Sequence, residues 1–300
     1  MAGDKSKIVC IYHKNCTDGT FSASVLKIKY PDCKLYPLNH GYEEEDFENI
    51  LNEVDKDTIV YITDFSLRDD DLKKLLSKAK EVINIDHHIG VKEKLEKYQK
   101  EFNNYKFIFD NNSSGASLTW KYLFGEENIP KIIKLVEDKD LWNWKYGDYT
   151  KFVNLYLYQY ADKPEEVLDF IKKDNVEELV KNGEVIAKFV DYIINKFVEN
   201  AEPTLLKIGD YKVKAFNVNN FQSEIGNILA EKYGEAVALF NIKGYQVRIS
   251  FRSLDNQSPS ALELAKILGG GGHKNASGAS IPLEEFCNLI NFNEEGEKDG

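Results

Sequence analysis

Short apolar runs alternate with helical patterns in the first part of the chain. Three runs rich in β-branched residues span Lys7–His13, Thr58–Thr63 and Val82–Ile85. Apolar residues at helical spacing separate them, at Asp18–Tyr30 and Asp69–Ala79. Continuous apolar runs of this length, separated by helices, are typical of parallel strands that are buried on both faces. The pattern therefore predicts an α/β fold, in which a parallel sheet carries helices on both faces.

The rest of the chain predicts a helical linker and a second domain. The middle has helical patterns, the longest from about Val176 to Val198, and Pro203 closes it because proline cannot continue a helix. Strand-like and helical segments then alternate, namely Lys212–Val218, Glu224–Lys232, Ala236–Ile242, Gln246–Ser253 and Ala261–Leu268. We expect one domain at residues 1–200, which includes the linker, and a smaller α/β domain at 203–292. The acidic tail after Asn291 is expected to be mobile.

The composition is that of a globular protein with an acidic balance. Of the 300 residues, 42% are hydrophobic and 30% are charged, and the net charge is −11. Duplex nucleic acid needs a basic surface, so duplex DNA is not an expected partner. A small anionic substrate stays compatible with this charge, because bound metal ions supply local positive charge.

The expected compartment is the cytoplasm. No stretch approaches the roughly 20 apolar residues that span a bilayer, so no membrane partner is expected. We find no signal peptide at the N-terminus. The four cysteines show no C-x-x-C pairing, which argues against a zinc ribbon or a disulfide framework. The sequence does not fix the oligomeric state, and a homodimer is one option.

Carboxylate and imidazole side chains gather at the ends of the three predicted strands. The first run ends in His13, with Asp18 nearby, the second is followed by Asp64, and the third by the triplet Asp86–His88. Ligands of open α/β sheets bind outside the carboxyl ends of the strands, so these residues are expected at one edge. A lone aspartate after a strand is by default a turn residue or a helix cap. The whole constellation instead favours a site for divalent ions such as Mn²⁺.

Four segments resemble the motifs of the DHH phosphoesterases, a superfamily that includes RecJ exonuclease, family II pyrophosphatase, nano-RNase and cyclic-di-AMP phosphodiesterases. They are NIDHHIG at Asn84–Gly90, YHKNCTDGTFSA at Tyr12–Ala23, ITDFS at Ile62–Ser66 and VEDKDLW at Val136–Trp142. The resemblance implies that His88 contacts phosphate or donates a proton, and that Asp86 ligates a metal or orients its neighbours. The metal ligands that it implies are His13, Asp18, Asp64 as a bridge, His87 and Asp138.

The first motif departs from the family pattern, because Cys16 stands where the family usually has its first metal-binding aspartate. As a thiolate ligand, Cys16 would favour a softer metal. As a bystander, it would leave a hard oxygen site at Asp18 and Asp64, with His13 and water completing the shell. We favour the bystander role and expect two Mn²⁺ ions, with Mg²⁺ or Co²⁺ as alternatives.

A glycine-rich segment, GGGGHKNASG at residues 269–278, resembles the GGGH-x-x-A-S-G motif of the DHHA1 substrate domain. Bare N–H groups of successive glycines can form a nest for an anion, although such a run is as often a flexible turn. Two of the three arginines, Arg248 and Arg252, lie four residues apart on one predicted strand, so they face the same side of the sheet. The planar guanidinium of an arginine suits bidentate binding of phosphate. The expected substrate-binding residues are Arg252, Ser253, Gly271, Gly272, His273, Ser277, Gly278 and Ser114. Ser114 is included because it precedes a predicted helix whose N-terminus either receives an anion or is merely capped.

The resemblance covers roughly residues 7–290 and implies a metal-dependent phosphoric ester hydrolase with a substrate cleft between two domains. We favour a nano-RNase-like phosphodiesterase that acts on short single-stranded oligonucleotides or dinucleotides, by two-metal activation of hydroxide. Cyclic dinucleotide hydrolysis and removal of phosphate from 3′-phosphoadenosine 5′-phosphate stay open as alternatives. A further alternative, prompted by Cys16, is a catalytically degenerate nucleotide-binding protein.

Overall fold

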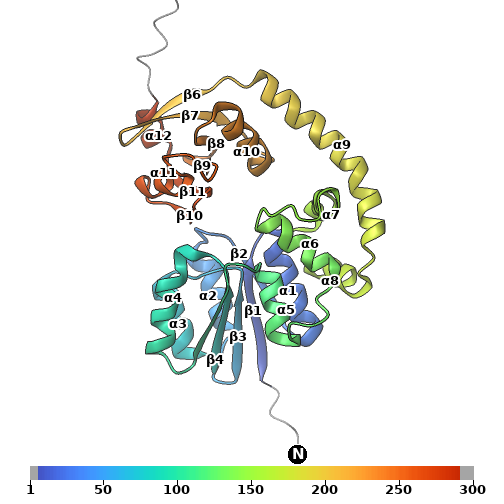
Figure 1. The fold of residues 1–300 in the computed structure, drawn as a ribbon. Helices are drawn as coiled ribbons and strands as arrows, with labels where there is room; N and C mark the ends of the chain where they lie inside the picture. Colours follow the sequence, from blue (N-terminus) through green and yellow to red (C-terminus); the bar gives the residue numbers. More distant parts are fainter. Residues whose placement is uncertain (1–5, 291–300) are drawn as a thin grey trace, which may run out of the picture. The chain divides into compact units, whose positions relative to one another are not determined.

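The computed structural model describes residues 6–290, and Figure 1 labels most of its helices and strands. The predicted mobility of the tail therefore lies outside the described residues. The chain divides into two compact units, unit 1 at residues 1–188 and unit 2 at residues 189–300. This division falls within one long helix, whose C-terminal end lies next to the boundary expected from the sequence.

Unit 1 is built on a five-stranded parallel sheet. Its elements are β1 (Lys7–His13), α1 (Thr17–Lys29), β2 (Lys34–Leu38), α2 (Glu44–Asn52), β3 (Thr58–Thr63), α3 (Asp69–Lys78), β4 (Glu81–Asp86), η1 (Ile89–Val91), α4 (Lys92–Glu101), β5 (Tyr105–Phe109) and α5 (Gly115–Phe124). The strand order is β2-β1-β3-β4-β5, and every neighbouring pair is parallel. The α/β fold expected from the sequence is confirmed, and β2 and β5 are additional edge strands.

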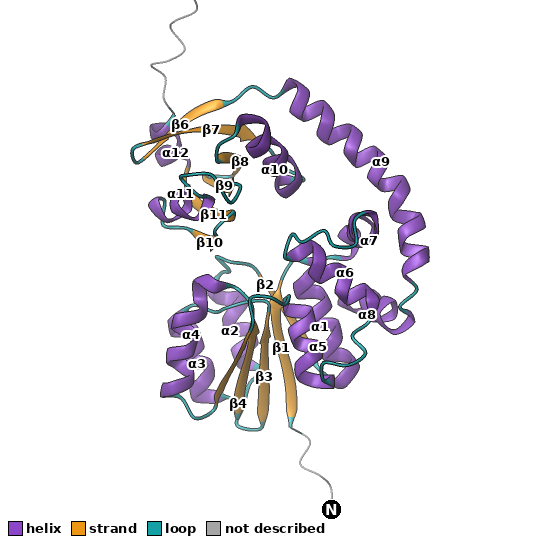
Figure 2. Cartoon of the chain, in the orientation of Figure 1, coloured by secondary structure: helices purple, strands orange, loops and turns teal. Residues whose placement is uncertain are grey.

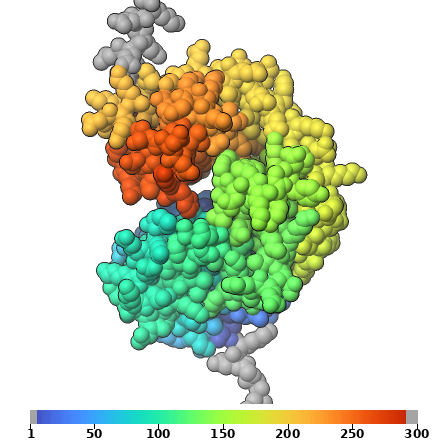
Figure 3. All heavy atoms as spheres, in the orientation of Figure 1, coloured from blue at the N-terminus to red at the C-terminus, as the bar shows by residue number. Residues whose placement is uncertain are grey.

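Helices cover both faces of this sheet, as the apolar runs predict (Figure 2). Val9 and Ile11 of β1 pack in a core with α2, α3 and α4. Cys10 and Tyr12 point to the other face, where they pack with α1 and α5. Side chains around α3 and α4 (teal) and of α5 to α7 (green) make up most of the visible surface of unit 1 (Figure 3).

A helical layer follows and packs on α1 and α5 through a third apolar cluster. Its elements are α6 (Lys131–Asp140), α7 (Asp148–Leu157), η2 (Tyr158–Tyr160), α8 (Pro164–Lys173) and the start of α9 (Val176–Asn200). Pro164 occupies the first turn of α8, where its missing N–H costs nothing. The predicted helical linker is therefore present.

Unit 2 contains a mixed six-stranded sheet with the order β10-β11-β9-β8-β7-β6. Its elements after α9 are β6 (Thr204–Ile208), β7 (Tyr211–Asn217), α10 (Gln222–Tyr233), β8 (Val237–Lys243), β9 (Gln246–Arg252), α11 (Ala261–Ile267), β10 (Gly271–His273), β11 (Ala276–Pro282) and α12 (Leu283–Leu289). Among the strands that the structure describes in this sheet, only β7 and β8 pair in parallel. Helices α11 and α12 cover the face that carries Val247, Ile249 and Phe251.

Within residues 6–290, none of the helices combines the length and the apolar character that a bilayer crossing requires.

Candidate metal centre

The carboxyl ends of β1, β3 and β4 lie side by side, because these strands are neighbours in the sheet. From β1 the chain adds β2 on one side, and it then adds β3, β4 and β5 on the other side. In such sheets, ligands bind where the strand order reverses, which here is between β1 and β3. His13 ends β1, Asp64 directly follows β3, and Asp86 ends β4. The topology thus brings three of the predicted site residues to one edge.

Asp64 presents its two carboxylate oxygens to two different groups of side chains. Oδ2 lies 3.5 Å from His13 Nδ1 and 3.4 Å from Cys16 Sγ. Oδ1 lies 3.3 Å from His87 Nε2 and 3.9 Å from His88 Nδ1. The Asp64 backbone has a φ of 52°, a region that aspartate enters more readily than most residues. A carboxylate held in this way can bridge two ions.

Asp18 is held by the N-terminus of α5. Its Oδ2 accepts a hydrogen bond from Gly115 N at 2.6 Å, and its Oδ1 accepts one from Ala116 N at 3.0 Å. These amides carry the partial positive charge of a helix start, which favours an anion there. Glycine is needed at position 115, because a Cβ atom would lie 2.7 Å from Asp64 Cβ and 2.9 Å from Asp18 Oδ2.

The prediction that Ser114 binds substrate is corrected by this arrangement. Ser114 is fully buried, and its hydroxyl accepts a hydrogen bond from Ser117 N at 3.4 Å. The anion at this helix start is the carboxylate of Asp18. Ser114 is therefore the N-cap of α5, which is the other role considered from the sequence.

Asp86 orients the two histidines that follow it. Its Oδ1 accepts hydrogen bonds from the backbone N–H of His87 at 2.7 Å and of His88 at 3.1 Å. The same oxygen lies 2.7 Å from His88 Nδ1. These bonds turn the chain after β4, so that the two imidazole rings lie 4.3 Å apart instead of on opposite faces of a strand. The contacts of Asp86 thus match the orienting role among the two that the resemblance allows.

The buried acids and histidines shift one another's pKa. Burial and the charges of Asp140 and Asp64 raise the pKa of Asp18. Burial disfavours the charged form of His87, but the hydrogen bond to Asp64 and the charge of Asp140 outweigh it and raise its pKa to about 10. Burial acts in the same way on His88, where the charge and hydrogen bond of Asp86 raise the pKa to about 9. Protonated imidazoles therefore balance clustered carboxylates here, and divalent ions could replace those protons.

Asp140 takes the place in the cluster that was predicted for Asp138. Asp140 Oδ2 lies 3.4 Å from His87 Nε2. The Asp138 carboxylate instead accepts hydrogen bonds from Lys145 N at 2.9 Å, from Tyr146 N at 3.1 Å and from the Thr150 hydroxyl. Asp138 therefore organises the loop after α6, and both of its carboxylate oxygens accept hydrogen bonds from that segment. The described ligand atoms form three groups, each within 4.8 Å: His13, Cys16 and Asp64; Asp64, His87 and His88; Asp18, His87 and Asp140.

Helix geometry explains why the sequence did not separate these two aspartates. Both lie in the segment VEDKDLW, and residues two apart on a helix point in directions that differ by about 200°. Only one of them can face the sheet edge. The two residues differ in their distance from the end of the helix. Asp140 is the last residue of α6, so its side chain can reach beyond the helix, whereas Asp138 lies two residues before this end.

Asparagine substitutions at the two positions are expected to have different effects. Asp140→Asn should weaken Mn²⁺ binding by about 10- to 100-fold while the melting temperature of the metal-free protein does not fall. Asp138→Asn should destabilise the fold by about 1–3 kcal/mol, because it disrupts the hydrogen bonds that the buried Asp138 carboxylate accepts from the buried Thr150 hydroxyl and from two backbone amides. Calorimetric Mn²⁺ titration and thermal unfolding measure both. Equal losses of metal affinity in the two variants would return Asp138 to the ligand set.

Metal affinity is expected to rise with pH. Below about pH 10, His87 holds a proton that a metal ion must displace. Each proton displaced makes the affinity rise about tenfold per pH unit. The raised pKa has the opposite effect on the metal-free fold: its contribution to stability is complete below about pH 6.5 and is lost as the pH rises toward the folded-state value. Mn²⁺ titrations between about pH 6.5 and 9 test this, and an affinity that stays constant over that range contradicts it.

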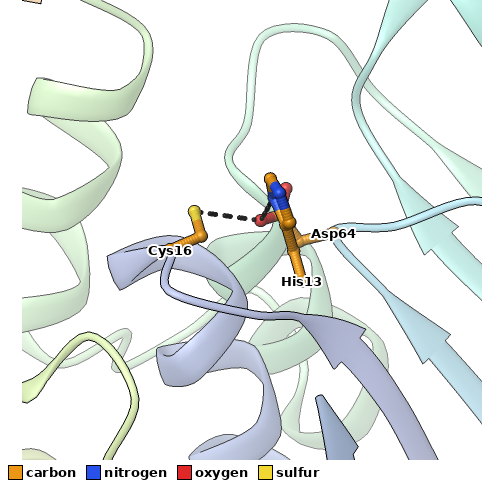
Figure 4. A group of neighbouring side chains, drawn as sticks. All are labelled: His13, Cys16 and Asp64. Carbon is orange, nitrogen blue, oxygen red and sulfur yellow. Dashed lines mark hydrogen bonds and ion pairs between the residues drawn. The ribbon is translucent and has the colours of Figure 1, made fainter. Parts of the chain in front are cut away.

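Cys16 lies inside the candidate centre, although the sequence favoured a bystander role. Figure 4 shows its sulfur pointing toward the Asp64 carboxylate, beside the His13 ring. The hydrogen-bond geometry makes Sγ the donor and Asp64 Oδ2 the acceptor. Burial and the charges of Asp64, Asp140 and Asp18 raise the pKa of this thiol, so it is protonated without a bound cation.

In unit 2, Arg252 is the last residue of β9, and its side chain reaches the start of α10. Its Nη2 donates to Ser223 Oγ at 2.8 Å and its Nη1 to Phe251 O at 2.8 Å. Burial lowers the pKa of this guanidinium. Ser253 is 3% exposed, and its hydroxyl accepts a hydrogen bond from Ala261 N at 2.9 Å. Ser253 thus supports the start of α11. Arg252, by contrast, is a partly exposed residue.

The glycine-rich segment forms a hairpin instead of an open loop. Gly271, Gly272 and His273 of β10 pair with Gly278, Ser277 and Ala276 of β11. The Ser277 hydroxyl donates to His273 O at 2.6 Å, which holds the hairpin closed. Gly272 has a φ of 139°, and a Cβ atom there would lie 2.7 Å from Ala276 O. At least at Gly272 and Ser277, the motif therefore has a structural role.

Comparison with known proteins places the fold. Residues 206–295 match the model of the DHHA1 domain. An uncharacterised protein of Acanthamoeba polyphaga mimivirus is 25% identical over 93% of this chain and 68% of its own length. RecJ of Thermus thermophilus, solved with Mn²⁺, superposes over 95% of this chain with a TM-score of 0.53 and 16% identity, and this chain spans 51% of it. A pGpG-specific phosphodiesterase of Vibrio cholerae superposes over 94% of this chain and 96% of its own, with a TM-score of 0.51 and 13% identity.

Proposed function

We propose that this chain, which carries a DHHA1 domain and the fold of DHH phosphoesterases, is a metal-dependent phosphodiesterase that hydrolyses short single-stranded oligonucleotides or dinucleotides. One observation carries the proposal above the others. The two oxygens of Asp64 face two separate groups of metal-ligating side chains. A shared carboxylate between two ligand groups is the arrangement that two-metal phosphoryl chemistry requires.

Different residues of unit 1 would bind the metal ions and donate the proton in this reaction. Asp64, Asp18, His87 and Asp140 would hold divalent ions, which would supply an activated water and stabilise the negative charge that develops on the phosphoryl oxygens. His88 is one-third exposed, so its ring can reach a substrate at the edge of the sheet. Because its Nδ1 is bound to Asp86, a proton for the leaving oxygen would come from Nε2. A pKa of about 9 keeps that proton in place at neutral pH.

The substrate class rests on charge and on similarity. The net charge of −11 disfavours long duplex binding, which depends on counterion release by basic side chains. The Vibrio cholerae phosphodiesterase of similar fold is described as specific for pGpG, a linear dinucleotide. Both points support a short substrate over a long one.

A substrate panel tests the proposal. Purified protein with Mn²⁺ is expected to cleave linear dinucleotides and short oligoribonucleotides faster than cyclic dinucleotides, 3′-phosphoadenosine 5′-phosphate or pyrophosphate. Mg²⁺ and Co²⁺ are compared in parallel. Preferred cleavage of a cyclic dinucleotide or of 3′-phosphoadenosine 5′-phosphate would reassign the substrate while leaving the metal chemistry in place. Nucleotide binding without cleavage would instead support a degenerate core.

Arg252→Gln is expected to raise KM for a dinucleotide by roughly 10- to 100-fold, because a charged hydrogen bond to phosphate contributes about 1.5–3 kcal/mol. The value of kcat should change much less, since Arg252 is proposed to bind substrate and not to act on the reacting atoms. Arg248→Gln is the matched control, because Arg248 lies on the same strand and is exposed. Equal effects of the two substitutions would contradict a specific role for Arg252.

A further inference from the structure

The loop before α1 holds the Cys16 sulfur in place. Asn15 has a φ of 55°, so the chain turns sharply between β1 and α1. Gly19 then packs against the end of β1, where a Cβ atom would lie 2.5 Å from His13 O. Cys16 is the N-cap residue of α1, yet its side chain makes no capping hydrogen bond. Its sulfur instead points toward Asp64 (Figure 4).

Cys16 differs from the other cysteines of the described chain. Cys10 and Cys33 are buried, and Cys287 is exposed. Among residues 6–290, only the sulfur of Cys16 belongs to a group of possible metal ligands. That group offers one imidazole nitrogen, one sulfur and one carboxylate oxygen, from His13, Cys16 and Asp64, all within 4.8 Å of one another.

The two sides of the centre therefore differ in their chemistry. Asp18, His87 and Asp140 offer only oxygen and nitrogen, which suit Mn²⁺. The side with Cys16 adds sulfur, and thiolate ligands select softer ions. Three protein ligands with an open fourth position are typical of zinc sites at which substrate binds.

We propose that Cys16 is a thiolate ligand and that the centre holds two unlike ions, a zinc-class ion at His13, Cys16 and Asp64 and a Mn²⁺-class ion at Asp18, His87 and Asp140. The second carboxylate oxygen of Asp64, which lies 3.3 Å from His87 Nε2, is shared with the Mn²⁺-class ion. On binding, the S–H bond of Cys16 breaks, a sulfur–metal bond forms, and one proton passes to solvent. The inference uses the same cluster as the proposed function, but it concerns which ions bind and not what is hydrolysed.

Cobalt spectroscopy tests the sulfur ligand directly. The full chain is stripped with a chelator and titrated with Co²⁺, since a Co²⁺–thiolate bond gives a charge-transfer band in the near ultraviolet. Wild type should show a band that saturates at one equivalent, and Zn²⁺ should abolish it. Cys16→Ser and Cys16→Asp should lack the band, whereas Cys287→Ser should keep it. Circular dichroism checks that each variant is folded.

Competition then tests the selectivity. After equilibration with equal Mn²⁺ and Zn²⁺, wild type should retain one zinc per chain at this site, and Cys16→Asp should lose at least about tenfold in preference for zinc over manganese. Co²⁺ bound at two equivalents without a thiolate band would overturn the inference, as would an unchanged zinc preference in Cys16→Asp. A thiolate band in a protein that cleaves no phosphodiester would refute the proposed function alone, and cleavage without the band would refute this inference alone.

Discussion

Asp64→Asn is expected to lower phosphodiester hydrolysis by about 10³-fold or more, the largest effect of any single substitution in the centre. Asp64 is the only described residue whose side chain belongs both to the group with Cys16 and to the group with His88. The amide keeps the size of the side chain, and asparagine adopts the positive φ of 52° as readily as aspartate does. The substitution therefore removes charge and leaves the backbone in place.

Metal titration and steady-state kinetics of Asp64→Asn provide the measurement. Both metal positions should weaken together, because one carboxylate serves both. Asp69→Asn is the control, since Asp69 follows the same strand but lies on the surface, with its side chain 57% exposed. If the variant keeps full activity, or loses one ion and binds the other normally, Asp64 does not bridge the two ions.

Gly115→Ala is expected to have the second largest effect. A methyl group at this position would lie 2.7 Å from Asp64 Cβ and 2.9 Å from Asp18 Oδ2. Because one neighbour is a short, buried side chain and the other is hydrogen-bonded to the backbone of α5, both carboxylates must move. We expect a loss of metal affinity of about 10- to 100-fold and a destabilisation of about 1–3 kcal/mol.

The direction of the stability change makes the Gly115 result specific. Gly115 is the first residue of α5 and its φ is not positive, so alanine suits the backbone there. At such positions glycine to alanine usually stabilises by roughly 0.4–1 kcal/mol, which is the opposite sign. Thermal unfolding of the metal-free protein and Mn²⁺ calorimetry measure the two effects. A Gly115→Ala protein with higher stability and unchanged affinity would show that the close approach at α5 is unimportant.

The strands of the catalytic edge were predictable because each is buried on both faces. Such strands appear in the sequence as unbroken apolar runs, and their polar ends mark the carboxyl edge of the sheet. The edge strands β2 and β5 gave weaker signals. Pro37 lies within β2, and a strand tolerates an internal proline only at the edge of a sheet. Lys106 breaks the apolar run of β5.

Contacts between distant segments could not be derived from spacing along the chain. The choice between Asp138 and Asp140 depends on how α6 is rotated about its axis, and that rotation is set by packing on α1, α5 and α7. Ser114 was misassigned because the anion at the start of α5 comes from Asp18, 97 residues away from Gly115. The inclusion of Cys16 follows from a turn at Asn15 whose geometry the sequence does not reveal.

Several expectations stay predictions. They are the domain limits at 1–200 and 203–292, a substrate cleft between domains, a cytoplasmic location, a homodimer and the absence of duplex DNA as a partner. The two metal ions are likewise an expectation, supported by donor groups that suit divalent ions. All of these except the domain limits depend on partners, ions or surroundings outside the chain itself.

The central claim is metal-dependent cleavage of a phosphodiester, and a chromogenic bis-aryl phosphate tests it without assuming the natural substrate. Protein stripped with a chelator is assayed for aryl alcohol release before and after Mn²⁺ is restored. The account predicts release only with the ion, and almost none from Asp64→Asn under the same conditions. Release at the same rate without metal, or no release from folded wild-type protein with Mn²⁺ bound, would contradict it.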